Sequence, residues 1–160
     1  MAKVYLGLGT NLGDKEANLH TAVRLIKEKI GEVTSLSSFY ATEPWGFTSE
    51  NAFLNAAACV ETQLGPQEVL QLTQEIEKEL GRTKKSSGGV YSDRLIDIDL
   101  LLWDDLILET PELTLPHPLM TERSFVMDPL VEIAPDYIHP ILHKPLRELK
   151  PLTDKENSDK

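Results

Sequence analysis

The order of hydrophobic periodicities along this chain restricts its fold more than any other feature of the sequence. Alternating apolar residues indicate strands, whereas apolar residues spaced three or four apart indicate amphipathic helices. In chain order, these patterns predict a strand over residues 3–9, a helix over 14–31, strands over 33–40 and 53–63, a helix over 66–81 and a strand over 95–103. This order is typical of a ferredoxin-like βαββαβ core. We therefore expect an α+β fold in which both helices cover one face of the sheet.

Outside this core the chain shows no regular period. Residues 42–51 and 82–93 are predicted to be polar loops, and Pro-rich turns with a short helix near 123–133 form a C-terminal extension. The polar tail over 153–160 is expected to be frayed. Because the chain has 160 residues and no linker-like stretch, we expect a single domain over 1–160.

The composition of the chain argues against several classes of binding partner and metal site. The 26 acidic residues outnumber the 16 Lys and Arg, which gives a formal net charge of −10. Such a charge argues against a broad nucleic-acid or membrane surface. The single cysteine, Cys59, excludes an internal disulfide and a cysteine-cluster zinc site. No signal-peptide pattern or membrane-length apolar run is present, so we expect a soluble, cytoplasmic protein. We also expect the protein to be a monomer.

Two aspartates in the last predicted strand form the strongest local signal. Asp97 and Asp99 would share one face of that strand, with Cα atoms about 6.5 Å apart. The residues expected on the opposite, buried face are Ile96, Ile98, Leu100 and Leu102. Neighbouring carboxylates repel each other unless a positive charge lies between them, and hard oxygen ligands suit Mg²⁺ that also binds substrate phosphates. The alternative is an exposed acidic pair neutralised by lysines.

A basic loop follows the second predicted helix. It contains Arg82 and Lys84, and Arg94 lies just beyond it. Cations on several sides of a carboxylate-bound metal are what a polyphosphate requires. Gly88 and Gly89 would allow the loop to close over a ligand as a lid. The alternative is a solvated connector, since basic Gly/Ser loops are common.

Several other residues are weak indicators of a binding site when each is taken alone. His117 lies between two prolines and can donate to a phosphate, although a lone histidine is more often structural. Gln74 and Glu77 share a helix face, as surface residues often do. Phe53 and Asn55 share a strand face, where an aromatic ring and an amide can stack on a flat ring and read its edge. Alternatively, Phe53 belongs to the core and Asn55 ends the paired region.

The glycines between the first strand and helix resemble a dinucleotide-binding fingerprint only in part. In Gly7-Leu-Gly9-Thr-Asn-Leu-Gly13 the last glycine is one residue late, and no acidic residue closes the second predicted strand. This disfavours a dinucleotide-binding oxidoreductase. We interpret these glycines as a tight turn that keeps side chains out of a neighbouring site.

Several segments together are similar to the 6-hydroxymethyl-7,8-dihydropterin pyrophosphokinase family of folate biosynthesis. The similarity extends in order from residue 3 to about Pro135, and the Arg–x–x–Asp–x–Asp segment with His117 downstream is its most specific part. The matching segments are Gly7-Leu-Gly9-Thr-Asn-Leu-Gly13, Ser37-Ser-Phe-Tyr40, Thr42-Glu-Pro44-Trp-Gly46, Phe53-Leu-Asn55-Ala-Ala, Gln74-Glu-Ile-Glu77, Gly81-Arg82, Arg94-Leu-Ile-Asp97-Ile-Asp99-Leu-Leu, Pro116-His117 and Arg123-Ser-Phe125.

The resemblance implies transfer of the terminal diphosphate of ATP to the pterin hydroxymethyl group, with release of AMP. It also implies two Mg²⁺ ions on the aspartate pair and a loop over 81–93 that closes over both substrates. The residues implied in catalysis are Arg82, Arg94, Asp97 and Asp99. Those implied around ATP are Gln74, Glu77, Arg82, Lys84, Arg94, Ile98, Thr114, His117 and Arg123. Those implied around the pterin are Thr42, Pro44, Trp45, Phe53, Asn55 and Phe125, with the two phenylalanines sandwiching the ring.

Departures from the family pattern concentrate in the closing loop. Lys84 stands where many members have Arg, and it supplies charge without a bidentate fork. Around Gly88 and Gly89 the loop is two residues longer, and Tyr91-Ser92-Asp93-Arg94 replaces a common Trp-Gly-Pro-Arg segment. The competing interpretation of the whole chain is a non-catalytic ferredoxin-like module that senses a nucleotide or a metal.

Overall fold

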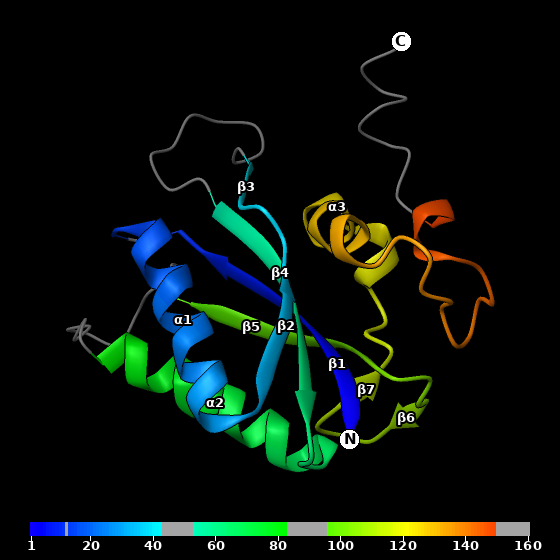
Figure 1. The fold of residues 1–160 in the computed structure, drawn as a ribbon, viewed down its shortest axis with the longest axis horizontal. Helices are drawn as coiled ribbons and strands as arrows, with labels where there is room; N and C mark the ends of the chain where they lie inside the picture. Colours follow the sequence, from blue (N-terminus) through cyan, green and yellow to red (C-terminus); the bar gives the residue numbers. More distant parts are fainter. Residues whose placement is uncertain (12, 43–52, 83–95, 150–160) are drawn as a thin grey trace, which may run out of the picture.

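The fold is a five-stranded antiparallel sheet with helices on both faces (Figure 1). This computed structural model describes residues 1–11, 13–42, 53–82 and 96–149. The strands of the sheet are β1 (Ala2–Thr10), β2 (Glu32–Leu36), β3 (Tyr40–Thr42), β4 (Phe53–Thr62) and β5 (Asp97–Trp103). Their order is β2-β4-β1-β5, and β3 also pairs with β4. The expected α+β class is confirmed.

Two helical crossovers interleave in this sheet. Because β4 is antiparallel to both β1 and β2, the strands β1 and β2 run parallel with β4 between them. In the same way, β4 and β5 run parallel on either side of β1. Each parallel pair is joined through a helix, α1 (Lys15–Lys29) in the first case and α2 (Pro66–Arg82) in the second. The two central strands, β1 and β4, therefore belong to different crossovers.

The helices divide between the two faces of the sheet. Helices α1 and α2 lie together on one face, and α3 (Ser124–Ile133) lies on the other (Figure 1). Asp14, where the first helix was predicted to begin, caps α1, and its side chain accepts a hydrogen bond of 3.1 Å from the Ala17 N–H. The remaining elements are the hairpin β6 (Leu108–Glu109) and β7 (Thr114–Leu115), and the 3-10 helices η2 (Met120–Glu122) and η3 (Leu146–Glu148).

Each face of the sheet has its own hydrophobic core. Alternate β1 residues serve the two sides, so that Val4, Leu6 and Leu8 pack under α1 and α2, whereas Tyr5 packs under α3. On the α3 side, the buried residues that come from α3 are Val126, Met127 and Leu130, and Ala134 follows directly after the helix. The sheet is therefore the shared wall of two cores.

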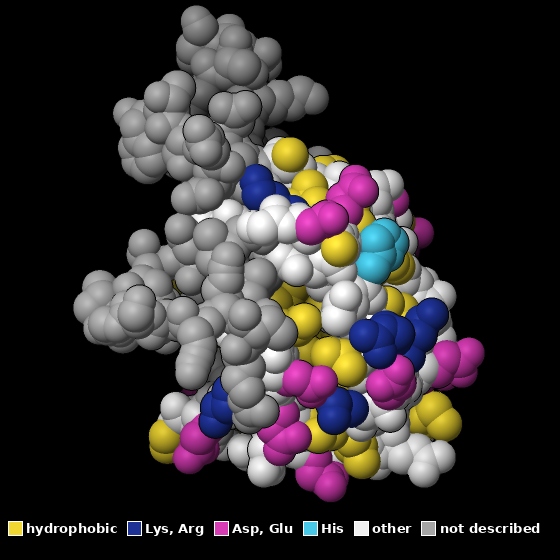
Figure 2. Space-filling view, turned by 90° about the vertical axis from the view of Figure 1, so that its left-hand side faces the viewer, with side chains coloured by type: hydrophobic (Ala, Val, Ile, Leu, Met, Phe, Trp, Pro, Cys, Tyr) yellow, Lys and Arg dark blue, Asp and Glu magenta, His cyan; other side chains and the backbone are white. Residues whose placement is uncertain are grey.

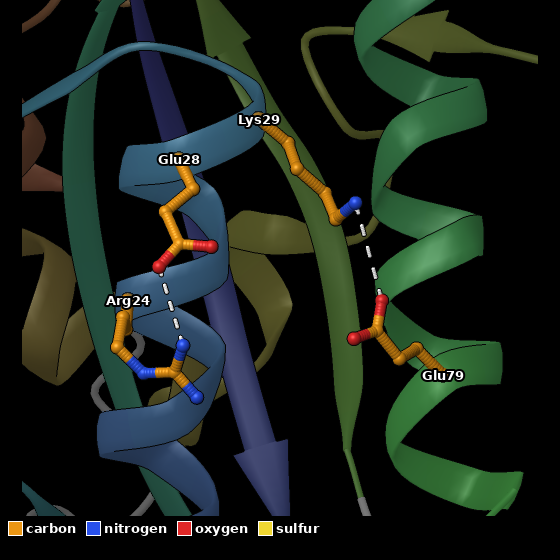
Figure 3. Close-up of polar contacts among 4 residues, drawn as sticks. All are labelled: Arg24, Glu28, Lys29 and Glu79. Atoms are coloured by element: carbon orange, nitrogen blue, oxygen red, sulfur yellow. Dashed lines mark hydrogen bonds and ion pairs between the residues drawn. The ribbon is translucent and has the colours of Figure 1, made fainter.

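Ion pairs on the outer surface add a further link between α1 and α2 (Figure 3). Arg24 and Glu28 pair within α1 at 3.2 Å, and Lys29 reaches Glu79 of α2 at 4.0 Å. Three of the four side chains are more than half exposed and Lys29 is 35% exposed, so these pairs contribute little beside the apolar core.

The strand predicted over 33–40 is in fact two strands. β2 ends at Leu36 because Ser37 changes the pairing: its N–H donates to the Ala57 carbonyl, and its Oγ accepts from the Ala57 N–H at 2.9 Å. After this side-chain bond the chain resumes ladder pairing at Tyr40 in β3. In between, Phe39 packs on the α1 side, with its ring 5.2 Å from that of His20.

The prediction for Leu102 was wrong. It was expected on the same face as Ile96, Ile98 and Leu100, but it packs in the core under α3. The reason is an irregularity in the β1–β5 register, where Tyr5 pairs with Leu102 but Leu6 pairs with Leu100. The extra residue, Leu101, inverts the alternation from that point on.

The other predicted elements agree with the structure where it describes them. The first strand, both long helices, β4 and the short helix near 123–133 are confirmed. The C-terminal extension, predicted as turns, also contains the β6–β7 hairpin. Most of the two predicted loops and the tail 153–160 lie outside the described residues. Among the described residues, no helix combines the length and apolar composition needed to cross a membrane.

Candidate functional site

The candidate site lies on the face of the sheet that carries α3, at one end of β1, β4 and β5. The ladder places Gly9 of β1 directly between Asp97 of β5 and Asn55 of β4. One step along, Gly7 lies between Asp99 and Ala57. Because residues paired across strands share a face, the two aspartates and Asn55 point to the same side. The glycines leave the floor between them without side chains.

Gly9 has a steric reason to be glycine. A Cβ at this position would lie 3.0 Å from the Asn55 Oδ1 and 3.6 Å from the Phe53 ring. Gly7 is less confined, because its added Cβ would meet only the Leu101 side chain at 3.4 Å. Both residues lie within β1, so the prediction of a tight turn was wrong for them; Gly13, with φ of 63°, lies in the turn.

Asp97 and Asp99 are half-buried on this face, as the strand period predicted. Between them, Ile98 is buried on the opposite side in the core under α1 and α2. Within the described ranges, no three His, Cys, Asp or Glu side chains gather into a metal-binding cluster. The aspartate pair itself offers hard oxygen donors, which is the donor set that Mg²⁺ uses when substrate phosphates supply its other ligands.

Glu77 lies at the outer edge of β5. Its Oε2 accepts a hydrogen bond of 2.7 Å from the Ile98 N–H, so α2 is joined to the strand between the two aspartates. Two residues that the resemblance implied around ATP, Glu77 and Ile98, are thus in direct contact. Gln74 is one turn away on the same helix face and is exposed.

His117 is held beside the aspartates by its backbone. Its N–H donates to the Leu101 carbonyl at 2.9 Å, and its Nδ1 accepts from the Leu119 N–H at 3.2 Å. Burial lowers the pKa of His117, and the nearby Arg123 adds to this effect, while Asp99 and Asp97 oppose it. In the neutral ring the acceptor role of Nδ1 leaves the proton on Nε2, which can therefore donate.

Arg123 and Phe125 stand at the start of α3. Arg123 is the residue just before the helix, and its guanidinium carbon lies 5.7 Å from the centre of the Phe125 ring. Phe125 is 41% exposed, and Phe53, at the start of β4, is 37% exposed. Aromatic rings that are partly open to solvent are available to stack on a flat ligand. Phe53 is therefore not a core residue.

The remaining predicted site residues are described in part or not at all. Thr114 is half-buried in β7, close along the chain to His117. For Thr42, which pairs with Phe53, and for Arg82, which ends α2, only the backbone is described. Those outside the described residues are Pro44, Trp45, Lys84 and Arg94.

Sequence reasoning missed one polar cluster near this site. Glu132, in the last turn of α3, accepts hydrogen bonds from Ser38 and Tyr40. The available signal was that Glu132 follows Phe125 by seven residues, a spacing that returns to the same helix face. For Ser38 and Tyr40, the only sequence signal was their place in the family segment Ser37-Ser-Phe-Tyr40.

Charges of both signs mix on the surface. On the face drawn in Figure 2, acidic and basic side chains of the described residues lie among one another. The described residues on this face form no broad area of positive charge.

Comparisons with known proteins identify the family of this chain. The family model described as 7,8-dihydro-6-hydroxymethylpterin-pyrophosphokinase matches residues 5–135. A 2-amino-4-hydroxy-6-hydroxymethyldihydropteridine pyrophosphokinase of Porphyromonas gingivalis is 52% identical over 141 residues, covering 88% of this chain and 95% of its own. The equally named protein of Aquifex aeolicus is 42% identical over 151 residues, covering 94% and 92%.

Solved structures show the same fold at lower identity. A wild-type HPPK-DHPS of Plasmodium falciparum, crystallised with pterin and p-hydroxybenzoate, superposes with a TM-score of 0.76 at 17% identity. The match covers 99% of this chain and 44% of that longer chain. The family match over residues 5–135 and the relative at 52% identity together confirm the resemblance drawn from the motifs. The chain therefore belongs to the 7,8-dihydro-6-hydroxymethylpterin-pyrophosphokinase family.

Proposed function

We propose that this pyrophosphokinase of folate biosynthesis transfers the terminal diphosphate of ATP to the hydroxymethyl group of 6-hydroxymethyl-7,8-dihydropterin and releases AMP. The observation that carries the proposal is the register of β1 with β4 and β5. It aligns Asp97, Gly9 and Asn55 in one row on one face of the sheet. Since adjacent strands are about 4.8 Å apart, the acidic and amide ends of this row are roughly 10 Å apart at the backbone.

Asp97 and Asp99 are the residues that would hold Mg²⁺. Their two carboxylates are half-buried and adjacent, and a dication between them offsets their mutual repulsion. When bound, divalent cations neutralise phosphate charge and lower the pKa of a coordinated hydroxyl. On the family resemblance we infer that this pair would hold two such ions, which would offset charge on the triphosphate.

On the ATP side, the protein supplies positioning and charge. His117 would donate from Nε2 to a phosphate oxygen, and Arg123 would add a guanidinium next to it. The edge of β5 at Ile98 would receive the nucleotide, with Glu77 already at that edge. The other residues proposed around ATP are Gln74, Arg82, Lys84, Arg94 and Thr114. Phosphoryl transfer depends mostly on such alignment and charge stabilisation.

On the pterin side, we propose that two aromatic rings and one side-chain amide bind the substrate. Asn55 is 6% exposed, and its amide would read the donor and acceptor edge of the ring. Phe53 and Phe125, both left partly open, would stack on the two faces of the pterin. Thr42, Pro44 and Trp45 are proposed to line the same pocket.

We also propose a specific topology for the fold. The order β2-β4-β1-β5 with two interleaved crossovers supports a ferredoxin-like βαββαβ core with a C-terminal extension, in one domain. A cytoplasmic monomer that uses small-molecule substrates and binds neither nucleic acid nor a membrane stays a prediction from composition.

The direct test is AMP formation by Asp97→Asn and Asp99→Asn variants. Each change keeps side-chain size but removes a charge that would hold Mg²⁺, so we expect a loss of at least about a hundredfold in turnover. Asp105→Asn, in the exposed turn after β5, is the matched control and should keep full activity. Thermal unfolding of all three should stay close to that of the parent chain. Wild-type turnover in either site variant would remove the metal assignment.

A titration separates the enzyme from a nucleotide or metal sensor. A pyrophosphokinase binds 6-hydroxymethyl-7,8-dihydropterin, and more tightly when Mg²⁺ and an unreactive ATP analogue are present. A chain that binds the analogue but shows no heat of pterin binding would be a sensor.

A further inference from the structure

One exposed carboxylate on α3 collects an unusual number of hydrogen bonds. Glu132 Oε1 accepts from the Tyr40 hydroxyl at 2.7 Å and from the Ser38 N–H at 3.0 Å. Its Oε2 accepts from the same N–H and from the Ser38 Oγ, both at 3.1 Å. These bonds join segments that are 92 and 94 residues apart in the sequence. We refer to Glu132, Ser38 and Tyr40 as the α3 latch.

The latch lies on the same helix face as the aromatic ring assigned to the pterin. Glu132 follows Phe125 by seven residues, so the two side chains project in nearly the same direction, about 10 Å apart along the axis. A rotation of α3 about its axis would therefore move both together. Pro129 lies between them and cannot donate to the Phe125 carbonyl, so holding Glu132 restrains the direction in which Phe125 projects through the rest of the helix.

The other end of the latch lies on the strand next to the pterin-reading residues. Tyr40 begins β3 and pairs with Asn55, and Thr42 at the end of β3 pairs with Phe53. Residues 43–52 follow β3 directly, and they include Pro44 and Trp45. The latch thus joins the helix that carries one stacking ring to the strand beside the other ring and the amide.

We propose that Glu132 is a positioning residue for the pterin, because it sets the spacing between Phe125 on α3 and the Phe53–Asn55 edge of β4. This inference rests on the proposed function of that site. The helix itself is already held to the sheet by buried Met127 and Leu130. Glu132 itself is exposed, so the buried core keeps the helix on the sheet and the hydrogen bonds to the Glu132 carboxylate restrain its orientation.

The experiment compares binding of the two substrates to Glu132→Gln. This change keeps the shape of the side chain but removes the charge and one acceptor. We expect the dissociation constant of the pterin, measured with Mg²⁺ and an unreactive ATP analogue, to rise roughly tenfold. The dissociation constant of the ATP analogue, measured without pterin, should change less than about twofold, and KM for the pterin should rise more than kcat falls.

Two further variants make the result specific. Tyr40→Phe removes one bond of the latch and should give a smaller loss of pterin affinity; combined with Glu132→Gln, the losses should be less than multiplicative. Glu28→Gln removes a carboxylate from an equally exposed pair on α1 (Figure 3) and should leave both affinities unchanged.

The possible outcomes distinguish failure of the proposed role of Glu132 from failure of the proposed enzymatic function. Unchanged pterin affinity in Glu132→Gln, equal losses for both substrates, or a loss that follows a lowered unfolding temperature would each overturn the positioning role. If Glu132→Gln does not fold, the same criteria apply to Tyr40→Phe. A parent chain that forms no AMP would instead contradict the proposed function.

Discussion

At the scale of single residues, the absence of a side chain shapes the site as much as the side chains do. Gly9 lies in the row between Asp97 and Asn55, and its added Cβ would come within 3.0 Å of the Asn55 oxygen. Gly31, just after α1, is confined for a different reason, because its Cβ would collide with the Glu61 carbonyl oxygen. The first glycine keeps a binding surface open, and the second lets a helix end against a strand.

The first prediction concerns Gly9→Ala. The methyl group must shift the Asn55 amide, so we expect pterin affinity to fall roughly tenfold, measured by calorimetric titration. Nothing lies within 4 Å of a Cβ added at Gly65, so Gly65→Ala is the control and should bind the pterin normally. Normal affinity in Gly9→Ala would show that this glycine is not required for the pterin surface.

The limits of sequence reasoning are also visible at single residues. Asp97, Asp99 and Asn55 could be placed on their faces, since the strand period is a local property. The positions of Ser38 and Leu102 could not. Ser38 bonds to Glu132, 94 residues away, and Leu102 changes face because of how β5 pairs with Tyr5. A contact between residues far apart in the sequence produces no periodic pattern of apolar residues from which it could be predicted.

At the scale of elements, the segment after α3 closes on itself around a histidine. Ile138 bridges to Pro145, and the Nδ1 of His139 accepts from the N–H groups of Ile141 and Leu142 at 3.2 and 3.1 Å. Burial lowers the pKa of His139, and the neighbouring His143 lowers it further. Protonation would turn the Nδ1 acceptor into a donor and oppose both bonds.

The second prediction follows from the sign of that shift. The folded-state pKa of His139 lies below the ordinary value of 6.5, so its contribution to stability is present above that pH and is lost as the pH falls. We expect the unfolding temperature to drop between about pH 7.5 and about pH 5.5. His139→Asn keeps an acceptor that does not titrate, and its drop should be smaller; an equal drop would assign the effect to other groups, such as His117.

Elements were predicted best where their signals were local. The cap at Asp14 and the helical periods defined α1 and α2, and the alternation of apolar residues defined β1 and β4. The break between β2 and β3 was missed because the Oγ of Ser37 replaces a backbone acceptor for Ala57, 20 residues away. Short two-residue strands such as β6 have too few residues to show any period.

At the scale of the whole molecule, one sheet separates two hydrophobic cores, and each core supports a different part of the candidate site. The core under α1 and α2 holds the back of β5, including Ile98 and Leu100, and so supports the strand that presents the aspartates. The core under α3 holds the helix that begins next to Arg123 and Phe125. Both cores share β1, β4 and β5, so neither layer is complete without the other.

The last prediction tests this division with two fully buried side chains. Ile26→Ala in α1 and Leu130→Ala in α3 each leave a cavity, and each should lower the free energy of unfolding by about 2–5 kcal/mol. Urea unfolding should remain a single transition in both variants, because the cores share one sheet. Only Leu130→Ala should also weaken pterin binding, since only α3 carries Phe125. Two separate transitions in Leu130→Ala would show that the α3 layer unfolds independently, and equal pterin affinities would show that α3 packing does not set the pterin site.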